Sequence, residues 1–155
     1  MSGVTAALDV LGWRPTLAAG YALHEGTGRV PGRVISEERG HFVVHDGDLT
    51  HAATVSGRLR HASGGNPLAY PSVGDWVVMT TGAGDASATI HALLARHSAI
   101  VRRAPVDHRH AVQVLAANVD VVFIVTSLNA DLNLRRLERY LAVAWESGAT
   151  PVVVL

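Results

Sequence analysis

Arginine and histidine are the residue types in this sequence most suited to chemistry, and several of them are close neighbours. Arginine binds phosphate through paired hydrogen bonds and stacks on nucleobases. Between residues 28 and 110, nine arginines stand against seven acidic residues, so any attraction to RNA must come from local clusters rather than from bulk charge. We predict RNA contacts in basic loops and at the ends of two strands, at Arg39, Arg58, Arg60, His61, Arg102 and Arg103.

Aromatic residues offer a second means of binding RNA. Phe42 and Trp76 are the only aromatic residues inside the strands expected between residues 28 and 104. Proteins that bind single strands use such side chains as platforms on which bases stack. The alternative is that both side chains belong to the core. The spacing of the residues leaves the two interpretations open.

No group of side chains indicates catalysis, a cofactor site or a metal site. His41 and His45 share a strand face, but a metal would need further ligands from neighbouring strands. Glu37 and Glu38 are adjacent and point to opposite sides of a strand, a poor geometry for acid–base chemistry. All 13 residues counted as lysine or arginine are arginine, so a Gly-Lys-Ser/Thr phosphate loop is absent. The lack of cysteine excludes disulfides and cysteine-ligated zinc.

The segment that must position most of these arginines, residues 28–104, has the pattern of a small barrel. Five short runs rich in valine, isoleucine and threonine are separated by turn-forming clusters such as Gly64-Gly65-Asn66-Pro67. In the run HFVVHD, Phe42 and Val44 alternate with histidines, as in a half-buried strand. We predict an all-β, five-stranded OB-type domain over residues 28–104, with an SH3-like barrel as the alternative.

Two segments flank this barrel. Residues 1–27 contain short helical patterns, and we expect an N-terminal arm packed on the barrel; a flexible, partner-binding tail is the alternative. Pro105 ends the last expected strand, and residues 105–118 form a connector in which residues 110–117 have the pattern of a turn of helix.

The last third of the chain, residues 119–155, predicts a strand, a helix and a second strand. Residues 119–126 are almost continuously apolar, which is typical of a strand buried on both faces of a parallel sheet. Asn129, Asp131 and Asn133 then offer side chains that cap a helix start, and Gly148 offers a conformation that ends one. A second apolar run follows Pro151. The pattern predicts a βαβ unit.

Composition limits the class of protein. The 155 residues are 48% hydrophobic and 17% charged, which is enough apolar content for a packed core and argues against global disorder. No apolar run approaches the length of a membrane-spanning helix. The first residues lack the basic segment and apolar block of a signal peptide, so we expect a monomeric, cytoplasmic protein that does not contact a membrane.

The chain from about residue 28 onward resembles, in collinear order, the ribosome small-subunit-dependent GTPases (the RsgA/YjeQ family of circularly permuted GTPases). The most specific part is residues 116–155, with Ala-Asn-Val-Asp before an apolar strand and Asn-x-Asp-x-Asn-Leu-Arg-Arg-Leu-Glu-Arg-Tyr-Leu after it. Leu132 replaces the phenylalanine that many members carry in that motif. The other segments that carry the resemblance are GRVISEERG, GRLRH, PSVGDWV and RHSAIVRR.

The resemblance implies an N-terminal OB-fold, then a permuted P-loop GTPase domain beginning at residue 119, then a zinc-binding domain. It implies a protein that assists late maturation of the small (30S) ribosomal subunit, contacts its rRNA, and hydrolyses GTP with magnesium when the subunit stimulates it. No position here matches the guanine motif, the phosphate loop, the Asp-x-x-Gly element or the zinc ligands. By resemblance, the guanine motif is expected to begin directly after Leu155.

Three hypotheses follow. The first is the N-terminal part of such a GTPase, with no cofactor or GTPase activity in these 155 residues alone. The second is a stand-alone OB-fold module that binds RNA. The third is a truncated, non-functional fragment whose apolar strands, 119–125 and 152–155, are exposed to aggregation.

Overall fold

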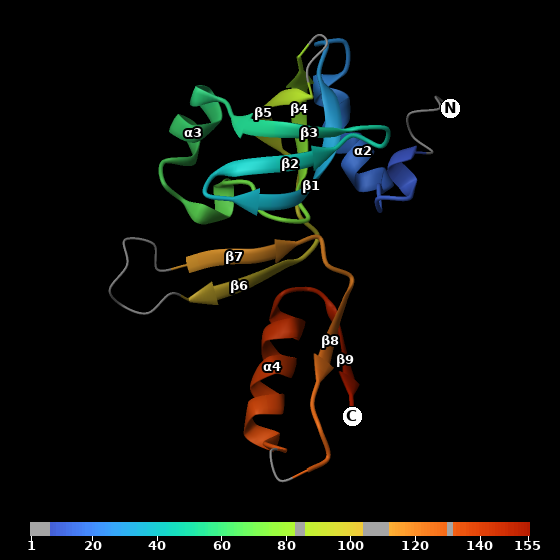
Figure 1. Cartoon of the computed structure of the whole chain (residues 1–155), viewed down its shortest axis with the longest axis vertical. Coiled ribbons are helices and arrows are strands. Elements are labelled where there is room, and N and C mark those ends of the chain that lie inside the picture. Colours follow the sequence, from blue (N-terminus) through green and yellow to red (C-terminus); the bar gives the residue numbers. More distant parts are fainter. Residues whose placement is uncertain (1–6, 83–85, 104–111, 130–131) are drawn as a thin grey trace. The chain divides into compact units, whose positions relative to one another are not determined.

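A computed structural model describes residues 7–82, 86–103, 112–129 and 132–155. The chain divides into two compact units, Met1–Ala95 and Arg96–Leu155. The first unit contains a β-barrel and an N-terminal arm, and the second contains a β-hairpin and a βαβ unit (Figure 1).

Five strands of the first unit close into a barrel in the order β1-β2-β3-β5-β4 (Figure 1). Every neighbouring pair is antiparallel except β3 with β5, which is parallel. This closed five-stranded barrel, with a helix between β3 and β4, confirms the OB-type prediction over the SH3-like alternative. The strands are β1 (Val30–Glu38), β2 (His41–His45), β3 (Thr50–Val55), β4 (Trp76–Thr81) and β5 (Ser87–Leu93).

Alternation along the strands builds the barrel core. On β2, Phe42 and Val44 are buried while His41 and Val43 are exposed, as the sequence pattern predicts. The barrel is tightly filled at Gly32, where an added Cβ would lie 2.6 Å from Cγ1 of Val44. Glycine is therefore favoured there, because the side chains of Val44 on β2 and Met79 on β4 closely approach the backbone of β1. The buried core cluster is Val34, Phe42, Val44, Ala53, Val55, Val77, Met79, Ala88 and Ile90.

The N-terminal arm packs on the barrel, as expected. It contains α2 (Pro15–Tyr21) and a 3-10 helix, η1 (Ala22–His24). Leu8 and Leu17 form a second buried cluster with Trp76 of β4, and the ring of Trp13 meets that of Trp76 edge-on at a centroid distance of 4.8 Å. Burial of these apolar side chains excludes a free, partner-binding tail for the described part of the arm.

Between β3 and β4 the chain forms α3 (Gly57–Ser63) and a 3-10 helix, η2 (Pro67–Ala69). The prediction that Arg58, Arg60 and His61 lie at the end of a strand is wrong, because all three belong to α3. Ser56 caps the helix, because its Oγ accepts the backbone N–H of Leu59 at 3.2 Å. Gly64 ends it with a left-handed conformation, φ +55°.

The second unit begins with an antiparallel hairpin of β6 (Ala99–Arg103) and β7 (Val112–Ala117). The run of apolar and threonine residues at 88–103 predicts a single barrel strand, and this prediction is wrong. The run is divided between β5 and β6, and β6 pairs with β7 instead of with a barrel strand. The turn of helix expected at residues 110–117 was also wrong, since residues 112–117 are β7; residues 110 and 111 lie outside the described residues.

A βαβ unit completes the chain, as predicted: β8 (Val121–Val125), α4 (Leu134–Glu146) and β9 (Thr150–Val154), with β8 and β9 parallel. The Oδ1 atom of Asn133 accepts the backbone N–H of Arg136 at 3.0 Å and so caps α4, while Asp131 lies outside the described residues. The expected burial of β8 on both faces was wrong. Phe123 is 66% exposed and Val125 is 75% exposed, because the sheet has only two strands in the described part of the chain.

The β2–β3 turn is held by a carboxylate. One oxygen of Asp46 accepts the backbone N–H groups of Asp48 and Leu49 at 2.9 and 2.8 Å, and the other lies 2.8 Å from Nε2 of buried His51. Burial raises the pKa of Asp46, but the backbone N–H groups of Leu49 and Asp48 and the ring of His51 lower it, and the net pKa lies below its usual value.

Replacement of this carboxylate, Asp46→Ala, is expected to lower the free energy of unfolding at pH 7 by about 1–3 kcal/mol, since it leaves two amides and a buried ring without their acceptor. Because folding lowers the pKa of Asp46, its carboxylate stabilises the folded chain fully at pH values above the unfolded pKa of about 4. This stabilisation is lost as the pH falls through the pKa of Asp46 in the folded chain. Urea unfolding of both proteins from neutral to acidic pH measures the difference. A difference that stays constant down to the lowest pH would contradict this account.

Candidate nucleic-acid interface

One end of the barrel gathers four of the six predicted RNA contacts. Because β1 is antiparallel to β2 and β2 is antiparallel to β3, the β1–β2 turn and the end of β3 lie at the same end of the barrel (Figure 1). The turn contains Arg39, and α3, which directly follows β3, carries the others. All four side chains are exposed. We call this set the basic end: Arg39, Arg58, Arg60 and His61.

Arg39 lies in the β1–β2 turn with φ +51°, a left-handed conformation that is unfavourable for a residue with a Cβ. Gly40 follows with φ +81°, and its N–H donates to Oε1 of Glu37 at 3.1 Å. The turn therefore holds a long, cationic side chain at the tip of a rigid hairpin. Loops between β1 and β2 of OB-folds commonly contact oligonucleotides.

Helix α3 presents Arg58, Arg60 and His61 to solvent. Arg60 and His61 lie in its last turn, where cations also stabilise a helix by interacting with its carbonyl end. That structural role does not account for Arg58, which lies near the start of the helix. The helix therefore carries more positive charge than capping requires, in a position to reach phosphate groups.

Arg102 and Arg103 do not belong to the basic end, because they are part of β6 in the second unit. Arg102 is exposed, and its Nη2 donates to Oε1 of Gln113 on β7 at 3.4 Å. The side chain of Arg103 lies outside the described residues. The six predicted residues thus form one group on the barrel and a pair on the hairpin.

Neither predicted aromatic platform is available for base stacking. Phe42 is 2% exposed in the barrel core, and Trp76 is 1% exposed beneath the N-terminal arm. The core interpretation of both residues is therefore correct. The ring that β2 does expose is that of His41, which the alternation with Phe42 already places on the outer face. His41 was not predicted as an RNA contact, because the pair His41 and His45 was considered only as a source of metal ligands.

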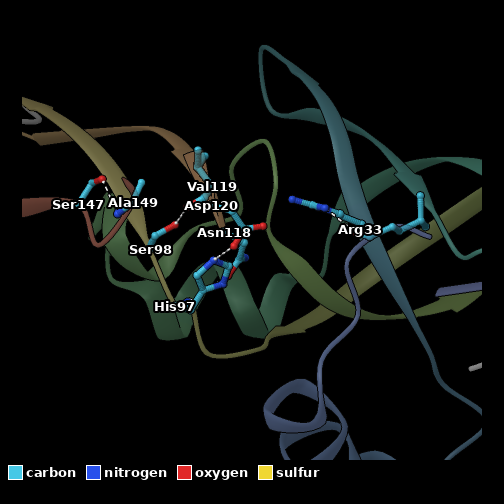
Figure 2. Close-up of polar contacts among 9 residues, drawn as sticks. Arg33, His97, Ser98, Asn118, Val119, Asp120, Ser147 and Ala149 are labelled. Atoms are coloured by element: carbon cyan, nitrogen blue, oxygen red, sulfur yellow. Dashed lines mark hydrogen bonds and ion pairs between the residues drawn. The ribbon is translucent and has the colours of Figure 1, made fainter. Parts of the chain in front are cut away.

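A polar junction in the second unit joins the start of β6 to the start of β8 (Figure 2). Buried Asn118 accepts the backbone N–H of His97 through Oδ1 at 3.1 Å, and Oγ of Ser98 donates to the carbonyl of Val119 at 2.7 Å. The ring of His97 lies 3.1 Å from the carboxylate of Asp120. These residues belong to the segment that shows the family resemblance, and their role here is structural.

A pocket of about 210 Å³ lies beside β8 and the start of α4, where ligands of open α/β sheets commonly bind. Its polar lining consists of Thr126, Asn133, Arg136 and Tyr140. A phosphate-binding loop needs backbone N–H groups of a glycine-rich turn and a lysine, and this lining has neither. The lining of this pocket therefore lacks the groups of a phosphate-binding loop. Among the described residues, no cluster of three or more His, Cys, Asp or Glu side chains could hold a metal ion.

Comparisons with known proteins agree with this architecture. The family model described as RsgA GTPase matches residues 93–155. "Small ribosomal subunit biogenesis GTPase RsgA" of Opitutus terrae is 44% identical over 96% of this chain and 42% of its own length. The similarly named RsgA 2 of Lactiplantibacillus plantarum is 39% identical over 96% of this chain and 41% of its own length.

Two solved structures share the fold. YjeQ from Thermotoga maritima aligns with a TM-score of 0.58 at 21% identity, over 81% of this chain and 40% of that one. YloQ, described as a circularly permuted GTPase, aligns with a TM-score of 0.55 at 19% identity, over 84% of this chain and 41% of that one.

An OB-type barrel followed by a βαβ unit that matches a GTPase family model defines the class: the circularly permuted GTPases that carry a barrel before the GTPase region. Within that class, the chain belongs to the RsgA/YjeQ family. It spans about two fifths of the length of the curated relatives it matches, over their N-terminal region. No described helix is long and apolar enough to cross a membrane.

Arg39→Gly separates the structural and functional properties of the β1–β2 turn. Glycine relieves the left-handed conformation, so we expect the free energy of unfolding to stay level or rise by up to about 1 kcal/mol. Loss of the guanidinium is expected to weaken RNA binding in the same variant. Thermal unfolding and RNA titration check the two effects, and a variant that is destabilised while binding RNA as before would contradict both assignments.

Proposed function

We propose that this chain is the N-terminal part of a GTPase that assists late maturation of the small ribosomal subunit in the cytoplasm. The observation that carries the proposal is the match of residues 93–155 to the RsgA GTPase family model, directly after an OB-type barrel. The names of the relatives, small ribosomal subunit biogenesis GTPases, support the small subunit and its rRNA as partners.

The barrel contributes the RNA contact in this proposal. Its basic end offers three exposed guanidinium groups and an imidazole on a closed, rigid frame, and guanidinium groups recognise phosphate by paired hydrogen bonds. The hairpin residues Arg102 and Arg103 add a second contact. Because no exposed Phe, Trp or Tyr lies on the described β2 and β3 strands, we expect phosphate contacts to dominate and binding to depend strongly on salt.

GTP hydrolysis is assigned to the whole protein. In the proposal, GTP, magnesium and zinc are bound by motifs that these 155 residues do not contain, and the chain alone is inactive as a GTPase. The exposed apolar strands β8 and β9 support a place in a larger α/β domain, since such composition is typical of strands covered on both faces.

A stand-alone RNA-binding module is the second candidate function. It is favoured by the barrel itself, which is closed, has its own buried core and carries the basic end without help from the second unit. A non-functional, truncated fragment is the third candidate, favoured by the exposure of Phe123 and Val125. Salt-sensitive RNA binding by this chain would argue against the third candidate.

The double variant Arg58→Ala/Arg60→Ala tests the RNA interface. Removing two phosphate contacts is expected to weaken binding of the chain to small-subunit rRNA on the order of tenfold, and to reduce the slope of log affinity against log salt by roughly 1.4 to 1.8. Fluorescence titrations between about 50 and 200 mM salt measure both. Both side chains are exposed, so the fold is expected to stay intact.

The matched control for this experiment is Arg135→Ala/Arg139→Ala, which removes the same charge from exposed positions on α4. Affinity and salt slope are expected to remain close to those of the unmodified chain. Equal loss in the two double variants would show a general effect of charge and would contradict a site at the basic end.

A titration of the 155-residue chain with labelled GTP is expected to show no binding at micromolar concentrations and no hydrolysis. The physical reason is the absence of lysine and of a glycine-rich phosphate loop. Micromolar affinity for GTP would overturn the proposal that the nucleotide-binding motifs are not among these 155 residues. It would not affect the proposed RNA interface, which the arginine variants test separately.

A further inference from the structure

The polar junction of the second unit centres on Asn118, which is 3% exposed and has φ +54°. A left-handed conformation at a residue other than glycine persists only where the surroundings impose it. Here the backbone N–H of Asn118 donates to the carbonyl of Ser98 at 2.9 Å, and its side chain accepts the N–H of His97. Asparagine suits the position, because its short amide tolerates this conformation and bonds locally.

The same segment before β6 also contacts the end of α4. The N–H of Ala99 donates to the carbonyl of Ser147 at 2.9 Å. Gly148, with φ +87°, approaches so closely that an added Cβ would lie 3.0 Å from the carbonyl oxygen of His97. Residues 97–99 therefore bond to the link between β7 and β8 on one side and to the end of α4 on the other.

The start of β9 is joined to this arrangement as well. The N–H of Thr150 donates to the carbonyl of Asp120 at 2.9 Å, and the carboxylate of Asp120 lies beside the ring of His97 (Figure 2). Three separate stretches of the second unit thus meet at one polar junction, in which Asn118, Ser98 and Ser147 are buried while the pair of His97 and Asp120 lies at its exposed edge. Buried hydrogen-bonded networks have few alternative arrangements, so their members are expected to open together.

We propose that this junction makes the β6–β7 hairpin and the βαβ unit one cooperative element, and that Asn118 is the positioning residue through which RNA bound at the hairpin stabilises strand β8. The RNA half of this inference rests on the proposed function, because it needs Arg102 and Arg103 to contact RNA. The hairpin is then part of the GTPase side of the protein rather than a passive linker.

Native-state hydrogen exchange of the 155-residue chain tests the cooperative element without RNA. In Asn118→Ala, the amides of β6, β7, β8 and β9 are expected to exchange together about tenfold faster or more, while those of β1–β5 are unchanged. Asn118→Asp keeps an acceptor for the N–H of His97 and is expected to restore most of the protection. Faster exchange confined to the immediate neighbours of Asn118 would overturn the proposal.

The matched control removes a hydrogen bond of similar length from an exposed site in the same unit. In Ser127→Ala the lost bond is the one from Oγ to Oδ1 of Asn129, which spans 2.8 Å after β8. The expected change in exchange is confined to that loop. Spread of the effect over all four strands in this variant would show general fragility of the unit, and would overturn a special role for the junction.

The RNA half is tested by repeating the exchange with small-subunit rRNA bound. Protection of β8 is expected to rise in the unmodified chain, and to fail to rise in Asn118→Ala although its affinity for RNA is unchanged. Binding without any change at β8 would overturn the coupling alone. Absence of RNA binding by the unmodified chain would overturn both the proposed function and the coupling between RNA and β8. The exchange experiment without RNA would still show whether the hairpin and the βαβ unit open as one cooperative element.

Discussion

Closure of the five-stranded barrel is the constraint on which the candidate RNA interface depends. The parallel pairing of β3 with β5 and the pairing of β1 with both β2 and β4 leave no free strand edge in the barrel. To close it, the chain must leave β3, cross one end of the barrel through α3, and re-enter as β4. That crossing places the arginines of α3 at the same end as the β1–β2 turn and Arg39. The basic end is therefore a product of topology.

Local patterns in the sequence predict much of this fold. The alternation in β2, the cap at Asn133 and the strand–helix–strand order around α4 depend on near neighbours in the sequence, and the structure confirms these three predictions. The misassigned α3 also had a local signal, because Ser56 and Gly64 bracket it as helix cap and helix end. The residues just before α3 strongly favour a strand, and a helix of only seven residues gives a weak helical pattern. The strand pattern was therefore extended into the helix.

Other features depend on distant residues and could not be predicted from the sequence. The partner of β6 is β7, and an apolar run contains no information on which strand it pairs with. The exposure of Phe123 follows from the number of strands in its sheet, not from its own neighbours. The same holds for the candidate site: residue types identified its arginines, but only the barrel closure brought four of them to one end and left Arg102 on the hairpin.

The central claim, that the basic end binds ribosomal RNA, is tested most directly by photo-crosslinking. A crosslinking side chain replaces His61 on α3 or, as a control within the same barrel, exposed Asp48 in the β2–β3 turn at the other end. With small-subunit rRNA bound, the account predicts efficient crosslinks from position 61 and few from position 48. Equal crosslinking from both positions, or crosslinks from position 48 alone, would contradict it.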